Sequence, residues 1–171
     1  MRRPKVWMLL VLVALVAVPL GIATNRYRAQ QRTIAELRRL GAHHIRLEPG
    51  LLGKWWPKVV GVEAHGRGFS DEGLALLAGL PDLRGLSLIG TRTTDDGLAH
   101  LAGLQGLEVI YLEDTEVTDA GLNQFARMSS LGELRVSGGR ITEAGLGRLR
   151  RTSPKLKVVQ GIVDPKNWTI G

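Results

Sequence analysis

LEVIYLEDTEVTDAGLNQFARM, residues 107–128, is one copy of a pattern that recurs along the chain every 24 residues. Similar copies begin at Val59, Leu83 and Leu131, and a partial copy begins at Leu156, after one extra residue. Self-similarity at a fixed period of about 20–50 residues is typical of solenoids, in which each unit buries its apolar side against the next. The pattern therefore decides the fold of most of the chain.

The first half of each copy predicts a short β-strand. Apolar residues stand at the first, fourth and sixth positions, so alternate side chains of the strand turn toward one side. The residues between them are expected to face outward. The residues expected to face inward are Val62, Ala64, Leu86, Leu88, Ile110, Leu112, Leu134 and Val136.

The second half of each copy predicts a short amphipathic helix. Apolar residues recur at every third position, as at Leu98, Leu101 and Leu104. A Ser or Thr followed by an acid precedes each helix, and we expect the hydroxyl to cap the helix while the acid stabilises its positive end. These pairs are Ser70 and Asp71, Thr94 and Asp95, Thr118 and Asp119, and Thr142 and Glu143, with Gly73, Gly97, Gly121 and Gly145 following in an invariant column.

A strand and a short helix every 24 residues resemble a leucine-rich repeat, whose period is about 20–29 residues. The matched motif is L-x-x-L-x-L-x-x-T-x-x-T-D-x-G-L-x-x-L, in which Thr91 and Thr115 replace the usual Asn or Cys. Its T-D-x-G-L portion is similar to repeats of F-box proteins, and the chain as a whole resembles bacterial membrane-anchored leucine-rich-repeat proteins. The resemblance implies an α/β fold, with a short solenoid of about four 24-residue strand–helix repeats over residues 59–160, preceded by an N-terminal transmembrane helix.

The N-terminal segment predicts a membrane anchor. Residues 6–23 read VWMLLVLVALVAVPLGIA and carry no charge. At about 1.5 Å per residue a helix of this length spans ~27 Å, slightly less than a hydrocarbon core of about 30 Å. A cleaved signal peptide is the alternative, with Gly21 and Ala23 as the small residues before the cut, although the apolar run exceeds the usual length of about 7–15 residues.

A connector joins this segment to the repeats. Residues 26–40 predict a helix with Ile34 and Leu37 on its apolar stripe and Gly41 as its stop. Ile45 and Leu47 then alternate with polar residues, which predicts a short strand with both side chains on one face. The chain thus divides into a basic start and anchor (1–25), a juxtamembrane helix, short strand and N-terminal cap (26–58), the repeats (59–160) and a C-terminal tail (161–171).

Positive charge is concentrated at the N-terminal end. Residues 1–54 carry ten basic and two acidic side chains, a net charge of +8, whereas residues 55–171 carry 13 and 14, a net charge of −1. A nucleic-acid-binding domain needs a basic face, and this balance does not favour one, so no nucleic acid is expected. A signal-like start favours a single-pass protein with its repeats outside the cytoplasm, while the count of Lys and Arg slightly favours the reverse.

The sequence predicts no catalytic, metal or cofactor site. The absence of cysteine excludes disulfides, thiolate–zinc sites and cysteine nucleophiles. On a strand the adjacent His43 and His44 would point to opposite faces and make poor joint metal ligands. The acidic run Glu113, Asp114, Glu116 and Asp119 lacks the spacing of a calcium loop. With no nucleophile, base and orienting residue converging, we expect neither enzymatic activity nor a small-molecule substrate.

The outward side of the strands is the remaining candidate surface. Stacked in register, Glu63, Ser87, Tyr111 and Arg135 would form one row, and Tyr and Arg are enriched at binding hot spots. The alternative is a wetted sheet face on which Tyr111 and Arg135 pair with each other. Because the inward pattern requires neither residue, we expect their replacement to leave folding nearly unaffected. The candidate partner-binding residues are Glu63, Ser87, Ile89, Val109, Tyr111, Glu113 and Arg135.

Charge changes sign along the repeats. Residues 55–125 carry four basic and eleven acidic side chains, a net charge of −7, whereas residues 126–171 carry nine and three, a net charge of +6. The basic end could favour an acidic partner or antiparallel self-association. Alternatively, it could reflect cations placed near helix C-termini, where the helix dipole favours them.

Together these features predict a membrane-anchored leucine-rich-repeat protein that serves as a protein–protein interaction module without catalysis. Two alternatives stay open: a secreted or periplasmic repeat domain left after signal cleavage, and an adaptor subunit of a larger enzyme complex. The expected partner is a protein that the sequence does not identify, and the membrane is expected to be contacted through residues 6–23.

Overall fold

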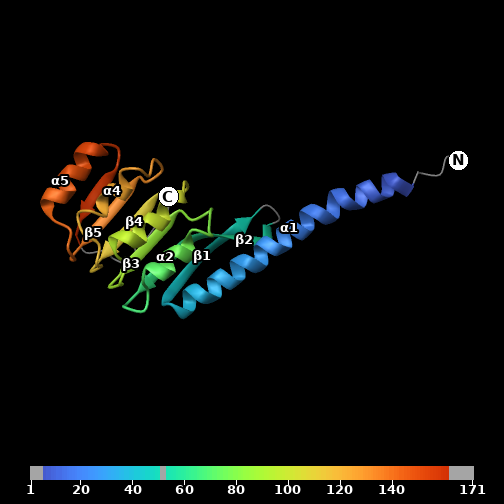
Figure 1. Cartoon of the computed structure of the whole chain (residues 1–171), viewed down its shortest axis with the longest axis horizontal. Helices are drawn as coiled ribbons and strands as arrows, with labels where there is room; N and C mark the ends of the chain where they lie inside the picture. The colour runs from blue at the N-terminus through green and yellow to red at the C-terminus, as the bar shows by residue number, and fades with distance from the viewer. Residues whose placement is uncertain (1–5, 51–52, 162–171) are drawn as a thin grey trace. The chain divides into compact units, whose positions relative to one another are not determined.

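The structure is a computed structural model that describes residues 6–50 and 53–161 (Figure 1). The chain divides into two compact units, one ending at Arg32 and the other beginning at Thr33. Of the residues that the structure describes, the first unit contains the N-terminal part of one helix. The second contains the repeats, and every site discussed below lies within it.

Helix α1 runs without interruption from Val6 to Arg39. The sequence predicted a membrane span followed by a separate connector helix, and the structure joins the two. Within the described part of the chain, no helix combines the length and the apolar character that crossing a membrane requires. The expected transmembrane helix is therefore without support from the structure. Large apolar side chains that are exposed along this stretch are Val11, Val13, Leu15, Val18, Leu20 and Ile22.

Among the described residues, six strands form one sheet in the order in which they occur in the sequence. β1 and β2 are antiparallel, and all later neighbours are parallel. In the parallel part each residue pairs with the residue 24 positions further on, as the repeat period predicts. The strands are β1 (Ala42–Gly50), β2 (Gly53–His65), β3 (Gly85–Ile89), β4 (Val109–Glu113), β5 (Glu133–Ser137) and β6 (Lys157–Gln160).

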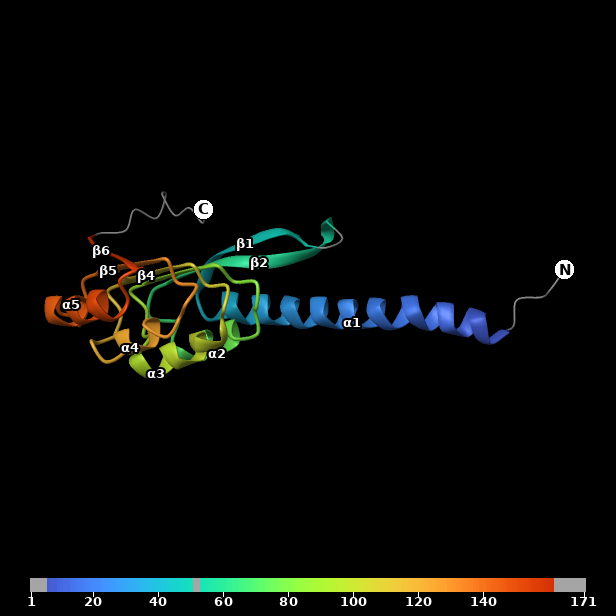
Figure 2. The same ribbon diagram turned by 90° about the horizontal axis from the view of Figure 1, so that it is seen from above.

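Short helices connect the parallel strands and lie together on one side of the sheet (Figure 2). The prediction of one short helix per repeat is confirmed, although the second is partly 3-10 helix and the third is a single turn. They are α2 (Asp71–Leu77), α3 (Asp95–Leu98) with the 3-10 helix η1 (Ala99–Gly103), α4 (Leu122–Phe125) and α5 (Glu143–Thr152). The mixed α/β architecture is thus the strand–helix solenoid that the leucine-rich-repeat resemblance implied.

The core fills the space between the sheet and the helices. All eight strand residues predicted to face inward are buried, and so are the leucines at every third position of the helical halves, such as Leu98, Leu101 and Leu104. Two of the polar side chains buried here lie against each other: the hydroxyl oxygens of Thr91 and Thr93 are 3.0 Å apart. Apolar side chains at alternate positions of each strand, aligned from one strand to the next, are sufficient to form this core.

The end of α1 and the strand β1 cover the first repeat. Ile34 and Leu37 are buried in the core, and Gly41 ends the helix with a φ of 109°, a conformation that favours glycine. Ile45 packs against the core as predicted, but Leu47 is 45% exposed. The pairing register shifts between Arg46 and Leu47 because β2 contributes one extra residue there. Ile45 pairs with Val62 and Leu47 with Val59, and both partners belong to the core, so the two residues share a face as predicted although Leu47 is not covered.

One turn position after each of the strands β2 to β5 has a positive φ. The residues are Gly66, Gly90, Asp114 and Gly138, with φ of 82°, 62°, 49° and 60°. The backbone N–H of each of the first three donates to the carbonyl of the neighbouring repeat, to Ile89, Glu113 and Ser137 respectively. Inter-repeat hydrogen bonding thus continues past the strand ends, and the sequence analysis did not anticipate this column.

Candidate functional site

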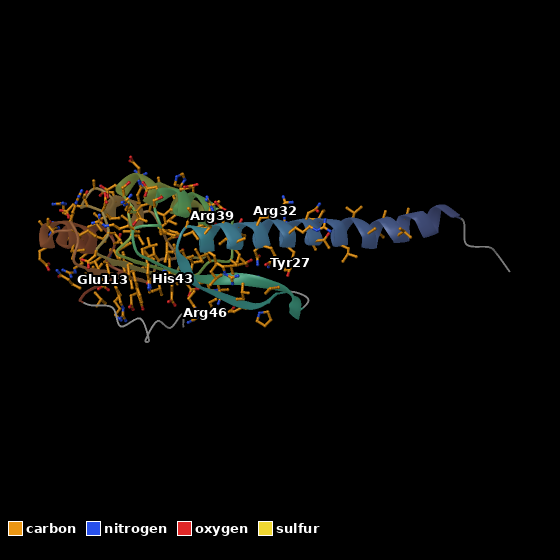
Figure 3. The ribbon with its side chains drawn as sticks, turned by 90° about the horizontal axis from the view of Figure 1, so that it is seen from below. Tyr27, Arg32, Arg39, His43, Arg46 and Glu113 are labelled. Carbon is orange, nitrogen blue, oxygen red and sulfur yellow. The ribbon has the colours of Figure 1, made fainter. Side chains whose placement is uncertain are left out.

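The outward side of the parallel strands carries the predicted row in register. Glu63 pairs with Ser87, Ser87 with Tyr111, and Tyr111 with Arg135. Val109 lies in the column on one side of this row, and Ile89 and Glu113 lie in the column on the other. The structure therefore brings all seven predicted residues onto one face of the sheet, and Figure 3 labels Glu113 on β4 with His43 and Arg46 on β1.

The two central residues of the row are buried. Ser87 is 3% exposed and Tyr111 is 2% exposed, whereas Glu63 and Arg135 are half-buried. The Tyr111 side chain therefore lies on the outward side of the sheet, but its ring is covered and is not available to a partner. Its replacement would remove buried packing, which corrects the expectation that folding would be nearly unaffected. Arg135, rather than Tyr111, is the residue of this row that can test binding.

Tyr111 and Arg135 pair with each other, as the alternative interpretation proposed. The Arg135 guanidinium carbon lies 5.1 Å from the centroid of the Tyr111 ring, which is cation–π geometry. Arg135 also donates a hydrogen bond from Nε to Glu133, and Lys157 donates from Nζ to the other oxygen of that carboxylate at 3.0 Å. These four side chains form one contact network across three strands, which we call the Tyr111 network.

The Tyr111 network keeps its charged groups ionised. Burial alone would raise the pKa of Glu133, but hydrogen bonds from Arg135 and Lys157 lower it overall. Burial raises the pKa of Tyr111, against the opposing effect of the Arg135 charge. The hydrogen bond to Glu133 raises the pKa of Arg135. The network therefore presents fixed charges rather than a proton donor near neutrality, which suits recognition better than acid–base chemistry.

Glu133 and Lys157 were not among the predicted partner-binding residues. They occupy the same column of the repeat on adjacent strands, 24 residues apart and directly paired in register. Opposite charges at equivalent positions of neighbouring repeats are the signal that could have identified them, since cross-strand pairs of opposite charge attract.

A second set of polar contacts joins consecutive repeats at the starts of the helices. The carboxylate of Asp71 accepts hydrogen bonds from the backbone N–H of Thr94 at 2.8 Å and from its hydroxyl at 2.7 Å. The same bidentate contact links Asp95 with Thr118 and Asp119 with Thr142. We call this arrangement the Asp–Thr clamp.

The clamp corrects the predicted role of the Ser/Thr–acid pairs. Ser70, Thr94 and Thr142 occupy N-cap positions as predicted, but only the Thr142 hydroxyl accepts a helix N–H, that of Gly145 at 3.1 Å. The N-cap residue of α4 is Gly121 instead of Thr118. A carboxylate that could stabilise its own helix is instead used to hold the next repeat.

The invariant glycines make room for the clamp. A Cβ atom at Gly121 would overlap the carboxylate of Asp95, and one at Gly145 would overlap that of Asp119. Gly73 belongs to the first repeat, where the nearest atoms to such a Cβ belong instead to the Phe69 ring, 2.5 Å away. Thr, Asp and Gly of the repeated motif are therefore parts of one structural device, which explains their spacing without a catalytic or binding role.

The histidines form a contact that the sequence did not predict. The ring of His43 lies 5.6 Å from that of His65, tilted by 56°, where β1 pairs with β2. The Nε2 atom of His65 is buried without a hydrogen-bond partner. Across the described ranges, no group of three His, Cys, Asp or Glu side chains is placed to hold a metal ion.

No protein-family model matches this chain, and no curated protein matches it either. Among solved structures, it is similar to internalin C2 from Listeria monocytogenes, with 17% sequence identity and a TM-score of 0.30. The match covers 63% of this chain and spans 65% of the internalin C2 chain. The fold is therefore assigned from the repeat geometry described above and not from this similarity.

Proposed function

We propose that this chain is a protein-interaction module of the leucine-rich-repeat type, and that the outward side of its parallel strands contacts a partner protein. The observation that supports the proposal is the row Glu63, Ser87, Tyr111 and Arg135, held in register on four neighbouring strands. The inward positions of the strands are filled by other side chains, and of this row Ser87 and Tyr111 are themselves buried while Glu63 and Arg135 are half-buried. Solenoids commonly bind through such repeated surfaces.

The charges on this face suggest the chemistry of the partner. Glu63 and Glu113 are half-buried acids on β2 and β4, while Arg135 and Lys157 are bases on β5 and β6. Arg135 retains donors beyond the one used by Glu133, because a guanidinium carries five N–H groups. A partner with basic groups toward β2 and acidic groups toward β6 would match this order, and complementary potentials of this kind give specificity and faster association.

Membrane attachment through the N-terminal segment is a further part of the proposal, and it rests on the sequence. Residues 6–23 carry no charge over 18 positions. Placement of the repeats outside the cytoplasm follows from the short basic start before this run, as in a signal-like segment. Attachment would hold the interaction module at the bilayer surface.

In-cell photo-crosslinking tests the proposed surface. A photoreactive residue is placed at Ile89 or Glu113 on the outward side, and separately at Ala75 on α2 or Ala102 in η1 as matched exposed controls. The proposal predicts crosslinks to the same protein from both outward positions and none from the controls. Crosslinks from Ala75 and Ala102 alone would place the partner on the helical side and contradict it.

A further inference from the structure

A shallow hollow lies on the helical side of the last repeat, between α4 and α5. Its apolar part is formed by Leu122 and Leu149, which are buried, and its rim carries both polar and charged groups. The lining residues are Asp119, Leu122, Asn123, Gly145, Arg148, Leu149, Arg151 and Thr152. The hollow is separate from the outward sheet face, because the helices and the sheet lie on opposite sides of the core (Figure 2).

Arg148 is fixed at the rim by an ion pair that leaves most of its donors available. Its Nη2 atom donates to Asp119 at 2.9 Å. Asp119 also accepts two hydrogen bonds from Thr142, and these bonds lower the pKa of the Asp119 carboxyl further than the Arg148 contact does. The negative charge of Asp119 is therefore already shared among three donors. Arg148 offers the remaining N–H groups of its guanidinium to another anion.

Arg151 supplies a positive charge that the described residues do not neutralise. Across the part of the chain that the structure describes, Arg151 takes part in no ion pair, whereas Arg150 on the same helix lies 3.8 Å from Glu143. The residues that line the hollow include two bases, Arg148 and Arg151, and one acid, Asp119, so their net charge is +1. Residues 126–161 around it hold eight bases and two acids, a net charge of +6.

The repeat pattern does not require these arginines. At the position of Arg148, the earlier repeats have Leu76, His100 and Gln124. At the position of Thr152, which also lines the hollow, they have the buried residues Leu80, Leu104 and Met128. The last repeat therefore replaces a continued apolar column with a polar rim around two buried leucines.

We propose that this hollow binds an acidic segment of a partner protein, with a carboxylate on Arg148 and Arg151 and an adjacent apolar side chain over Leu122 and Leu149. The positive rim selects the carboxylate by charge, and the planar guanidinium groups suit it geometrically. The leucines add a small apolar contact. This site is independent of the proposed outward surface, and it can be occupied whether or not that surface binds a partner.

Fluorescence anisotropy with the full chain tests the proposal. The probe is a labelled peptide of sequence EDLEDLED, and the control peptide QNLQNLQN keeps its length and its leucines but carries no charge. We expect the acidic peptide to bind at least about tenfold more tightly than the amide peptide at ~0.1 M salt, since the contact is partly electrostatic. Equal binding of the two peptides would overturn the proposal.

Two double variants separate the hollow from general attraction to a basic surface. R148E/R151E changes two lining residues, and R150E/K155E makes the same change in net charge at exposed positions outside the lining. We expect the first variant to weaken peptide binding at least about tenfold and the second less than about threefold. Equal weakening by both variants would show that only net charge matters and would overturn the site.

Further measurements keep the result interpretable. Arg151→Gln alone breaks no ion pair among the described residues and places no negative charge at the C-terminal end of α5, so it should weaken binding with a nearly unchanged melting temperature. Arg135→Ala on the outward face should leave peptide binding unchanged, which distinguishes this site from the proposed partner surface. If R148E/R151E instead abolishes salt-sensitive dimerisation in sedimentation runs without peptide, the occupant is a second copy and the proposal is wrong.

Discussion

The carboxylate of Asp95 holds Thr118 of the following repeat through two hydrogen bonds, one from its backbone N–H at 2.8 Å and one from its hydroxyl at 2.6 Å. The contact crosses from one repeat to the next and recurs at the same position along the stack. In a solenoid, stability depends on such nearest-neighbour interfaces as well as on the individual repeats. The T-D-x-G part of the motif can therefore be tested as a coupling device.

Removing one clamp should destabilise the fold. Asp95→Ala leaves the Thr118 N–H and hydroxyl without their acceptor. A hydrogen bond to a charged group contributes about 1.5–3 kcal/mol to the free energy of unfolding. We expect a loss in the lower part of that range, measured by urea unfolding. Asp96→Ala is the matched control, because Asp96 is the adjacent acid, is exposed, and its side chain makes no hydrogen bond among the described residues. Equal losses for the two variants would contradict the clamp.

The glycine of the motif should depend on the same carboxylate. Gly121→Ala places a methyl group where the Asp95 carboxylate lies, so the clamp must open. We expect a destabilisation of about 1–3 kcal/mol. In a double-mutant cycle, Gly121→Ala should cost clearly less in the Asp95→Ala background, because the obstructing group is gone.

Gly103→Ala provides the control for this cycle. A Cβ at Gly103 would meet nothing within 4 Å, and the residue lies in the 3-10 helix η1. Its replacement should therefore be close to neutral and should not interact with Asp95→Ala. Strict additivity of Gly121→Ala and Asp95→Ala would mean that the glycine is present for another reason.

Acid should weaken the clamp at Asp119. Hydrogen bonds from the backbone and side chain of Thr142, followed by those from Arg148, lower the pKa of the Asp119 carboxyl in the folded state. Because this pKa is lower in the folded state, the ionised carboxylate stabilises the fold at pH values above its unfolded-state pKa of about 3.9. That stabilisation is lost as the pH falls through the folded-state pKa. Urea midpoints measured from pH ~5 downward should therefore fall less steeply for Asp119→Asn than for the unchanged chain. Identical pH profiles would contradict this assignment.

Membrane attachment is tested by placing charge in the uncharged run. Leu12→Arg and Val13→Arg should each add about 2.5–3.5 kcal/mol to insertion near the centre of the segment. The double variant should therefore leave the membrane pellet after a carbonate wash. Asn25→Arg with Ala29→Arg adds the same charge beyond the run and should remain in the pellet. Retention of the Leu12 and Val13 variant would exclude a spanning anchor.

The strand columns were predictable because they depend on local alternation and a fixed period. Val62, Leu86, Ile110 and Leu134 are buried in register, as their 24-residue spacing implied. The exposure of Leu47 was not predictable, because alternation indicates which face a side chain takes but not whether other residues cover it.

The clamp was not predictable because its partners are 23 residues apart. Ser or Thr followed by Asp has a local interpretation as a helix cap, and the sequence contains nothing that distinguishes this from a contact with the next repeat. Tyr111 shows a similar limit. Alternation assigned its side chain to the outward face, but direction does not determine exposure, and the residue is 2% exposed.

The affinity of the crosslinked partner for Arg135→Ala tests the proposed surface most directly. Arg135 is half-buried on the outward face, whereas Arg92→Ala changes an exposed arginine that forms no ion pair among the described residues. If the outward face binds the partner, Arg135→Ala should weaken affinity by about 2 kcal/mol, or roughly 30-fold, and Arg92→Ala should have little effect. Unchanged affinity for Arg135→Ala, with both variants folded as judged by their melting temperatures, would contradict the proposal.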